Sequence, residues 1–334
     1  MFWSHALAGA IIFAAAPAFA DSLDAGTLPS QTRWVLHIDA DGVRQAPALM
    51  EKIRQRVVEP QKADLLAKVT FLERITGMQF PQDLHDATLF GTSFDQTGAC
   101  VRIHATNLNE TGITAFLRAD AEFSQVDHNG HNVLTWRDLG ADRLMYGTFA
   151  KRDVILISAN IKALLEALDA SDAKTPGLKP ESPLSPPKLA ANTPQPLLWM
   201  AGDNLAELPR MQNTESPLLA QMEAASMGVK WINDRALVEV TVTSKNEKVA
   251  QEMRAVAEGA KAFLSLMAAD EHASARNKLL SNMMQKFGTE TDGKIVKGRW
   301  ELDVNNVDLL LNTIHGEQAA VTAPALVKPA NGRP

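Results

Sequence analysis

The chain has very few of the residues on which several common kinds of functional site depend. It contains one cysteine, Cys100, which excludes an internal disulfide framework and any zinc or iron–sulfur site built from several cysteines. It contains one tyrosine, which argues against an aromatic ligand-stacking surface. Basic residues are not in excess, because 33 Lys+Arg face 39 Asp+Glu and the net charge is -6. Binding to nucleic acid through charge needs clustered Lys and Arg, so we expect no nucleic-acid partner.

The rest of the composition is that of an ordinary globular protein. The chain has 334 residues, of which 46% are hydrophobic, so it is too apolar to be disordered. Its length corresponds to about two domains of roughly 150 residues each. A chain of this size buries enough surface to fold without disulfides.

The first twenty residues carry no Asp, Glu, Lys or Arg. An apolar run over 6–16 is followed by Pro17, and Ala18-Phe19-Ala20 then supplies a small–x–small cleavage site. This pattern predicts a signal peptide over 1–20. An uncleaved N-terminal anchor is the alternative, because the positively charged start of a typical signal is missing. No second apolar stretch approaches 18 residues, so we expect a periplasmic or secreted protein with no membrane span after signal cleavage.

Proline divides the remaining chain. Seven of the seventeen prolines fall between Pro176 and Pro196, which predicts an exposed, extended linker. The predicted organisation is a signal peptide at 1–20, a first α+β module at 21–172, a Pro-rich linker at 173–196, a second α+β module at 197–316 and a disordered tail at 317–334.

The two halves resemble each other in sequence. Residues 99–110 align without gaps on residues 236–247, and five of the twelve pairs are identical. Residues 154–168 align on residues 300–314, where a strand ends at an asparagine suited to cap a helix with one apolar stripe. These pairings favour one module made twice, with an extra hairpin in the first half.

The periodicity predicts an α+β fold with two related halves, each an antiparallel sheet with helices packed on one face. Strands are expected near 33–39, 87–94, 99–106, 122–128, 131–137, 143–149, 153–158, 197–202, 227–233, 236–243, 286–291 and 294–304. Helices are expected near 46–57, 60–76, 111–119, 160–169, 216–225, 246–269, 272–286 and 306–314.

The sharpest candidate for a metal site is Asp127-His128-Asn129-Gly130-His131. If Asn129-Gly130 forms a two-residue turn, the two imidazoles stand opposite each other with Cβ atoms ~5 Å apart. That spacing suits shared ligation of Zn or Cu, with Asp127 or Asp138 as a third ligand. The alternative is a solvated hairpin tip that binds no metal, in which case the protein has no cofactor.

Two other groups of residues resemble parts of known kinds of site. Cys100 and His104 lie on one strand, but residues i and i+4 of a strand are ~13 Å apart, too far for a nucleophile–base pair, so Cys100 is interpreted as a small core residue. His37-Ile38-Asp39-Ala40-Asp41-Gly42 contains a fragment of a calcium loop, but Ala48 stands where its glutamate should be. We therefore interpret Asp41 as a turn or cap residue.

No recognisable catalytic motif is present. The sequence lacks a G-x-S-x-G elbow, H-E-x-x-H, a P-loop and a Rossmann fingerprint, so no catalytic residue is assigned.

The signal peptide and the segments LFGTSF, LMYGTFAKRDVILIS and LVEVTVTSKN resemble exported bacterial proteins of unknown function built from duplicated strand–strand–helix modules. The resemblance covers most of the chain beyond the signal peptide and brings no catalytic residues with it.

Three functions remain open on the sequence alone. The first is a non-catalytic binding or interaction protein of the bacterial cell envelope, which contacts a protein or small ligand in a groove between the two halves. The second is a metal-binding protein that uses the His128–His131 hairpin. The third is an enzyme whose site is not recognisable from motifs.

Overall fold

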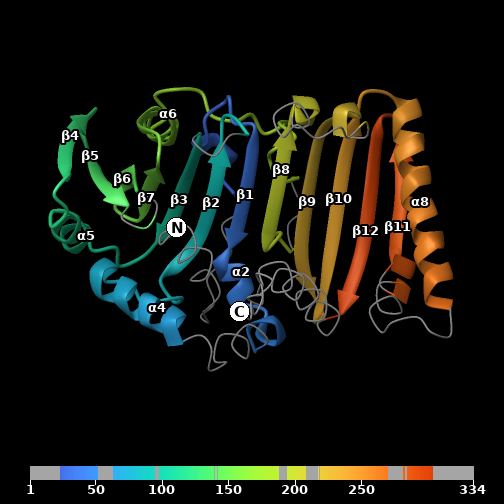
Figure 1. The fold of residues 1–334 in the computed structure, drawn as a ribbon, viewed down its shortest axis with the longest axis horizontal. Helices are drawn as coiled ribbons and strands as arrows, with labels where there is room; N and C mark the ends of the chain where they lie inside the picture. Colours follow the sequence, from blue (N-terminus) through green and yellow to red (C-terminus); the bar gives the residue numbers. More distant parts are fainter. Residues whose placement is uncertain are drawn as a thin grey trace, which may run out of the picture.

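The computed structural model describes residues 23–51, 63–94, 98–138, 140, 142–187, 194–207, 217, 219–269, 281–282 and 284–303. Within them the chain forms one twelve-stranded antiparallel sheet with helices packed against it, so the α+β prediction is confirmed (Figure 1). The predicted signal peptide at 1–20 and tail at 317–334 lie outside the described residues.

All twelve predicted strands are present. They are β1 (Trp34–Asp39), β2 (Leu84–Gly91), β3 (Ala99–Ala105), β4 (Ser124–His128), β5 (His131–Asp138), β6 (Arg143–Lys151), β7 (Val154–Ser158), β8 (Leu198–Asp203), β9 (Met222–Ile232), β10 (Arg235–Ser244), β11 (Phe287–Asp292) and β12 (Ile295–Asp303). The helices are α2 (Ala40–Arg44), α4 (Ala63–Thr76), α5 (Glu110–Leu117), α6 (Ile161–Ser171) and α8 (Glu247–Ala269), with short 3-10 turns η1 (Ala25–Thr27), η3 (Leu205–Glu207) and η4 (Leu219–Gln221).

The strand order shows how the two halves of the chain are joined. The order is β11-β12-β10-β9-β8-β1-β2-β3-β7-β6-β5-β4. Read outward from the centre, the first half runs 1-2-3-7-6 and the second runs 8-9-10-12-11, with the β4–β5 hairpin as an addition to the first. The halves meet where β1 pairs with β8, from Trp34 opposite Gly202 to Ile38 opposite Leu198. Two separate sheets were expected, but this pairing makes one.

Cross-strand partners point to the same side of a sheet, so the register defines its two faces. We call the face of Ile103 and Val238 the front face and that of Arg102 and Glu239 the back face. One front-face row runs through Ile155, Ile103, Ala87, Ile38, Leu198, Val229, Val238, Trp300 and Phe287. The parallel back-face row runs through Leu156, Arg102, Thr88, His37, Trp199, Gly228, Glu239 and Arg299.

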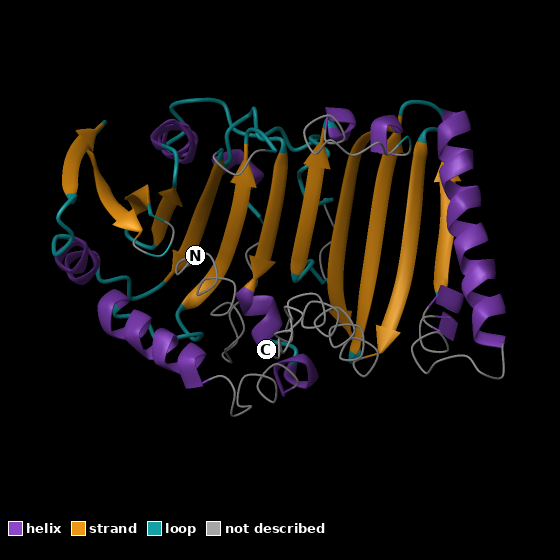
Figure 2. Cartoon of the chain, viewed as in Figure 1, coloured by secondary structure: helices purple, strands orange, loops and turns teal. Residues whose placement is uncertain are grey.

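Helices pack on both faces of the first half (Figure 2). Helix α5 buries Ile113 and Leu117 with Ile157 on the front face, whereas α6 buries Leu164 with Leu156 on the back face. The expectation of helices on one face is therefore wrong for this half. Strand β7 explains why: nearly all of its VILIS residues are buried, and a strand buried on both sides needs a cover on each. Helix α8 packs on the front face of the second half through Ala250 and Met253.

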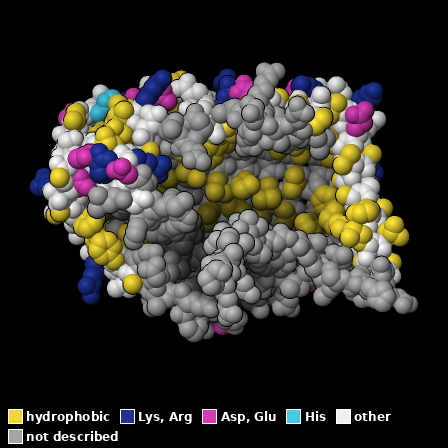
Figure 3. Space-filling view, in the orientation of Figure 1, with side chains coloured by type: hydrophobic (Ala, Val, Ile, Leu, Met, Phe, Trp, Pro, Cys, Tyr) yellow, Lys and Arg dark blue, Asp and Glu magenta, His cyan; other side chains and the backbone are white. Residues whose placement is uncertain are grey.

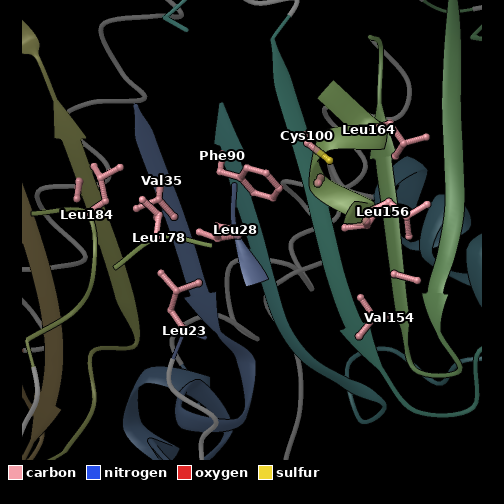
Figure 4. Packing of buried hydrophobic residues seen from close by; sticks show 14 of the residues in the cluster. Leu23, Leu28, Val35, Phe90, Cys100, Val154, Leu156, Leu164, Leu178 and Leu184 are labelled. Carbon is pink, nitrogen blue, oxygen red and sulfur yellow. The ribbon is translucent and has the colours of Figure 1, made fainter. Parts of the chain in front are cut away.

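Part of the proline-rich segment belongs to the back-face core (Figure 4). Leu178 and Leu184 are buried beside Leu28 and Val35, and the indole Nε1 of Trp199 donates to the Leu184 carbonyl at 2.8 Å. The segment differs from the exposed linker expected because these leucines supply apolar surface that the sheet needs.

Several helix predictions need comment. The expected helix at 216–225 is wrong, because this stretch holds η4 and then enters β9 at Met222. The expected helix at 306–314 lies outside the described residues, as do most of the helix expected at 272–286 and residues 52–57 of the helix expected at 46–57. None of the described helices is long and apolar enough to cross a membrane.

Candidate functional site

The His128–His131 hairpin has the backbone that the sequence predicts. Asn129 and Gly130 form the two-residue turn with φ values of 58° and 89°, and His128 is the direct cross-strand partner of His131. Positive φ at both positions is why Asn-Gly suits this turn.

The side chains of this hairpin contact helix α6. The Nε2 atom of His128 lies 3.3 Å from Asp169 Oδ1, and that of His131 lies 2.9 Å from Asp172 Oδ2. Asp127 accepts instead from the Gly130 N–H at 3.4 Å, which fixes the turn.

The predicted third metal ligands are not brought to these histidines. Asp138 stands at the far end of β5, where it accepts from the Gly140 N–H. Within the described ranges no group of three or more His, Cys, Asp or Glu side chains is arranged to hold a metal ion. Zn or Cu binding by His128, His131 and Asp127 stays a prediction.

Cys100 is a core residue in the described structure. It is 1% exposed beside Leu156 and Phe90, and burial raises the pKa of its thiol to about 12 (Figure 4). A thiol held in this protonated form is a poor nucleophile. His104, which lies on the same strand, bonds to Asp86 instead.

The calcium-loop fragment forms a helix start. Asp39 is the residue that caps α2, accepting from the Gly42 N–H at 2.8 Å. Asp41, interpreted as a turn or cap residue, lies in the first turn of α2 but does not cap it; it is buried in an ion pair with Arg44 and bonds to His85 at 2.9 Å. The capping role moves to Asp39 because the helix begins at Ala40.

His37 is buried on the back face, where its imidazole is in the neutral form. It is 3% exposed, and its Nδ1 lies 2.9 Å from Thr88 Oγ1. Burial lowers the pKa of His37 to about 4, since the charged imidazolium loses its hydration there. Its Nε2 atom has no hydrogen-bond partner within the part of the chain that the structure describes.

Sequence reasoning missed a polar network around Asp86. Arg102 Nη1 donates to Asp86 Oδ1 at 2.8 Å, and His104 Nδ1 lies 3.0 Å from Asp86 Oδ2. This hydrogen bond raises the pKa of His104. Burial alone would raise the pKa of Asp86, but the bonds from His104 and the charge of Arg102 lower it. The available signal was that Arg102 and His104 sit at alternate positions of one strand and share a face.

The most distinctive site is an apolar cavity on the front face of the first half. It holds about 70 Å³ between the sheet and helices α4 and α5. Ala87, Ile103 and Ile155 of the front-face row form its floor, while Leu72 of α4 and Phe116 of α5 cover it. Apart from Thr76 and Thr148, every lining side chain is apolar or glycine.

A cavity of this size is expensive in a folded core. Protein interiors seldom hold voids larger than one water molecule. At about 24 cal/mol per Å³, an empty apolar cavity of 70 Å³ lowers the free energy of unfolding by about 1.7 kcal/mol. An apolar group that fills the cavity removes this destabilisation, and the free energy regained contributes to its binding.

The cavity floor continues as an apolar surface into the second half. Beyond Ile38 the row passes through Leu198, Val229 and Val238, and Met200 in the neighbouring row is 41% exposed. Figure 3 shows hydrophobic side chains gathered over the middle of this face.

Helix α8 adds apolar side chains on the same side of the molecule. Val256, Phe263 and Leu266 are 59%, 60% and 72% exposed. Large exposed apolar patches on proteins often mark interaction sites.

The cavity does not lie in a groove between the two halves, which was the location expected. Hydrogen-bonded pairing of β1 with β8 closes the seam between the halves, so the sheet is continuous there. The described residues that line the cavity all belong to the first half.

Known proteins give little to compare. No family model and no curated protein matches the chain. Solved structures of TP0453 in crystal forms III, I and IV are similar to it, with TM-scores of 0.44, 0.41 and 0.42 and sequence identities of 8%, 9% and 9%. The matches cover 89%, 89% and 87% of this chain and 100%, 98% and 97% of those chains.

Proposed function

We propose that this protein is an exported, non-catalytic binding protein whose ligand is an elongated apolar chain, of the alkyl or acyl class. The apolar cavity under α4 and α5 carries this proposal. Concave, largely preformed apolar sites are the usual places where proteins hold such ligands.

The chemistry of the lining favours binding over catalysis. Its side chains offer hydrophobic contact but no carboxylate, imidazole, amine or thiol, and the Thr76 hydroxyl donates to the Leu72 carbonyl. General acid–base and nucleophilic mechanisms need such groups within hydrogen-bond reach of the reacting atoms.

The shape of the site favours an elongated ligand. A space of about 70 Å³ takes only a short stretch of an alkyl chain. The adjoining rows through Ile38, Leu198 and Met200 offer the remaining carbons a continuous apolar path, with water at Met200 for a polar end group.

The predicted signal over 1–20 supports an envelope location. Cleavage after Ala20 leaves Asp21 as the first residue, and the product is periplasmic or secreted. Intact mass of the protein recovered from the periplasm or medium tests this, and retention of residues 1–20 contradicts it. The shared strand order of the two halves supports their origin by duplication.

Binding is tested by calorimetric titration of the exported protein with n-alkanols of 6, 8, 10 and 12 carbons. Each carbon that enters the apolar site contributes about 0.8 kcal/mol, so affinity rises roughly fourfold per carbon until the site is full. Ala87→Leu places three more carbons in the cavity and abolishes this rise.

The matched control is Ala115→Leu, the same change at an exposed position of α5. It leaves the titration unchanged. The proposed function is contradicted if affinity does not rise with alkanol length in the native protein. It is also contradicted if affinity still rises in Ala87→Leu.

A further inference from the structure

Two Arg–Asp–His groups meet on the side of β2 and β3 away from the cavity. In the first, Arg44 of α2 pairs with Asp41, and Asp41 Oδ2 lies 2.9 Å from His85 Nδ1. Asp41 and Arg44 are 3% and 6% exposed, so this pair is inside the protein.

The second group mirrors the first. Arg102 and His104 hold the two carboxylate oxygens of Asp86 at 2.8 and 3.0 Å. The two groups touch through their imidazoles, because the ring centroids of His85 and His104 are 4.8 Å apart with planes tilted by 39°. Each histidine therefore has a carboxylate behind it and another histidine in front.

The backbone that carries this network also forms the wall of the cavity. Leu84 and Ala87 line the cavity, while His85 and Asp86 between them belong to the network. On β3, Ile103 lines the cavity and His104 points away from it. A shift of His85 or His104 therefore moves the cavity floor.

Arg44 holds the cavity wall at the start of β2. Its Nη1 donates to the carbonyls of Pro81 and Leu84, which bracket the turn into β2. The carboxylate of Asp41 holds Arg44 and His85 together, so the histidine pair and the cavity wall share one anchor.

Titratable groups on the neighbouring elements surround the histidine pair and its partners. Asp153, in the turn before β7, lies 3.4 Å from His104 Nε2 and is half exposed. Asp39 and Asp83 act on Arg44, and His37 of β1 acts on Asp86. The nearby carboxylates favour one proton on the pair, whereas a second proton sets two cations face to face at 4.8 Å.

We propose that His85 and His104 form a proton-operated clamp on the apolar cavity. With one proton on the pair, the network is closed and the cavity wall is fixed. A second proton, taken up as the pH falls, separates the rings, loosens residues 81–87 and releases the apolar ligand. This inference rests on the proposed function for its ligand, but the clamp itself is a property of the free protein.

Ligand-free protein separates the two ideas. Methyl NMR of Leu84 and Ile103 is followed from pH 8 to pH 4.5 together with the histidine Cε1–H signals. We expect both methyl groups to shift with the midpoint of the histidine pair. His104→Gln, which keeps a neutral hydrogen bond, removes the shift, and Asp153→Asn moves the midpoint to lower pH.

The control is His128→Gln, which changes a histidine outside the network and leaves the profile unchanged. Methyl shifts that persist in His104→Gln, or a midpoint that ignores Asp153→Asn, overturn the clamp whether or not a ligand binds.

The ligand arm uses 1-decanol at pH 7.5 and pH 5. The clamp predicts roughly tenfold weaker binding at pH 5 in the native protein and less than twofold change in His104→Gln. Equal affinity at both pH values in the native protein overturns the clamp and leaves the proposed function standing. No decanol binding at either pH defeats the proposed function, and the ligand-free titration still decides the clamp.

Discussion

The two halves of the sheet follow the same strand order but are buried in different ways. In the first half both faces are covered, so β7 reads VILIS with nearly every residue buried. In the second half β10 reads RALVEVTVTS, and its polar residues such as Glu239 alternate with apolar ones. The back face of the second half carries ion pairs, including Lys230–Glu239 and Arg299–Glu301.

This difference shows that strand order and burial are separate properties of a sheet. A strand buried on both faces needs a near-continuous apolar sequence, whereas one with a solvated face needs only alternation. Helix α6 is the element that distinguishes the back faces of the two halves, because it covers that of the first half through Leu164 and Leu168. The apolar front face is what both halves retain.

The largest expected effect is on the cover of the first half. Leu164→Ala removes a side chain of α6 that is 0% exposed and should lower the free energy of unfolding by about 3 kcal/mol. Val256→Ala, at a 59% exposed position of α8, should cost less than about 0.5 kcal/mol. Urea unfolding measures both, and equal costs would remove the contrast between the halves.

The next effect concerns the buried histidine of the first half. Between pH 6.5 and about 4 the unfolded chain binds a proton at His37 that the folded chain refuses, so stability is complete above pH 6.5 and falls as the pH drops. The loss amounts to about 3 kcal/mol. His37→Leu should remove this pH dependence, while Thr241→Leu on the back face of the second half should keep it. Urea unfolding at pH 7 and pH 4.5 tests this, and an unchanged slope in His37→Leu contradicts it.

A smaller effect on stability is expected at the two equivalent helix caps of the halves. Asn109 and Asn246 are equivalent in the sequence alignment, and each side chain accepts from a backbone N–H three residues later, at 2.9 and 3.0 Å. Asn109→Ala and Asn246→Ala should each cost about 1 kcal/mol in thermal or urea unfolding. A cost at only one of them would mean that the two caps are not equivalent.

The smallest effect is expected on the charged back face of the second half. Arg299→Ala breaks an exposed ion pair with Glu301 and should change the free energy of unfolding by less than about 0.5 kcal/mol. Urea unfolding in low and high salt measures it. A loss above 2 kcal/mol would show that this face is covered like its counterpart.

The sequence allowed every strand of this sheet to be predicted, because alternation and turn residues are local signals. The prediction of a helix at 216–225 was wrong because non-local contacts decide the structure of this segment. Met222 and the residues after it pair with β10 and β8, and such long-range pairing overrides local helix preference.

The candidate site was largely beyond sequence reasoning. The cavity is lined by residues from Leu72 to Ile157, which come together only in the folded sheet. The His85–His104 contact was also hidden, because an irregularity in the register between Leu84 and Asp86 reorients His85. Only the facing pair at His128 and His131 followed from local turn geometry.

The pairing of β1 with β8 also orders events in time. Because a chain is made from its N-terminus, residues 34–38 are present long before their partners at 198–202. Throughout that interval one edge of β1 offers unpaired backbone groups beside Leu36 and Ile38, a template for association with other chains.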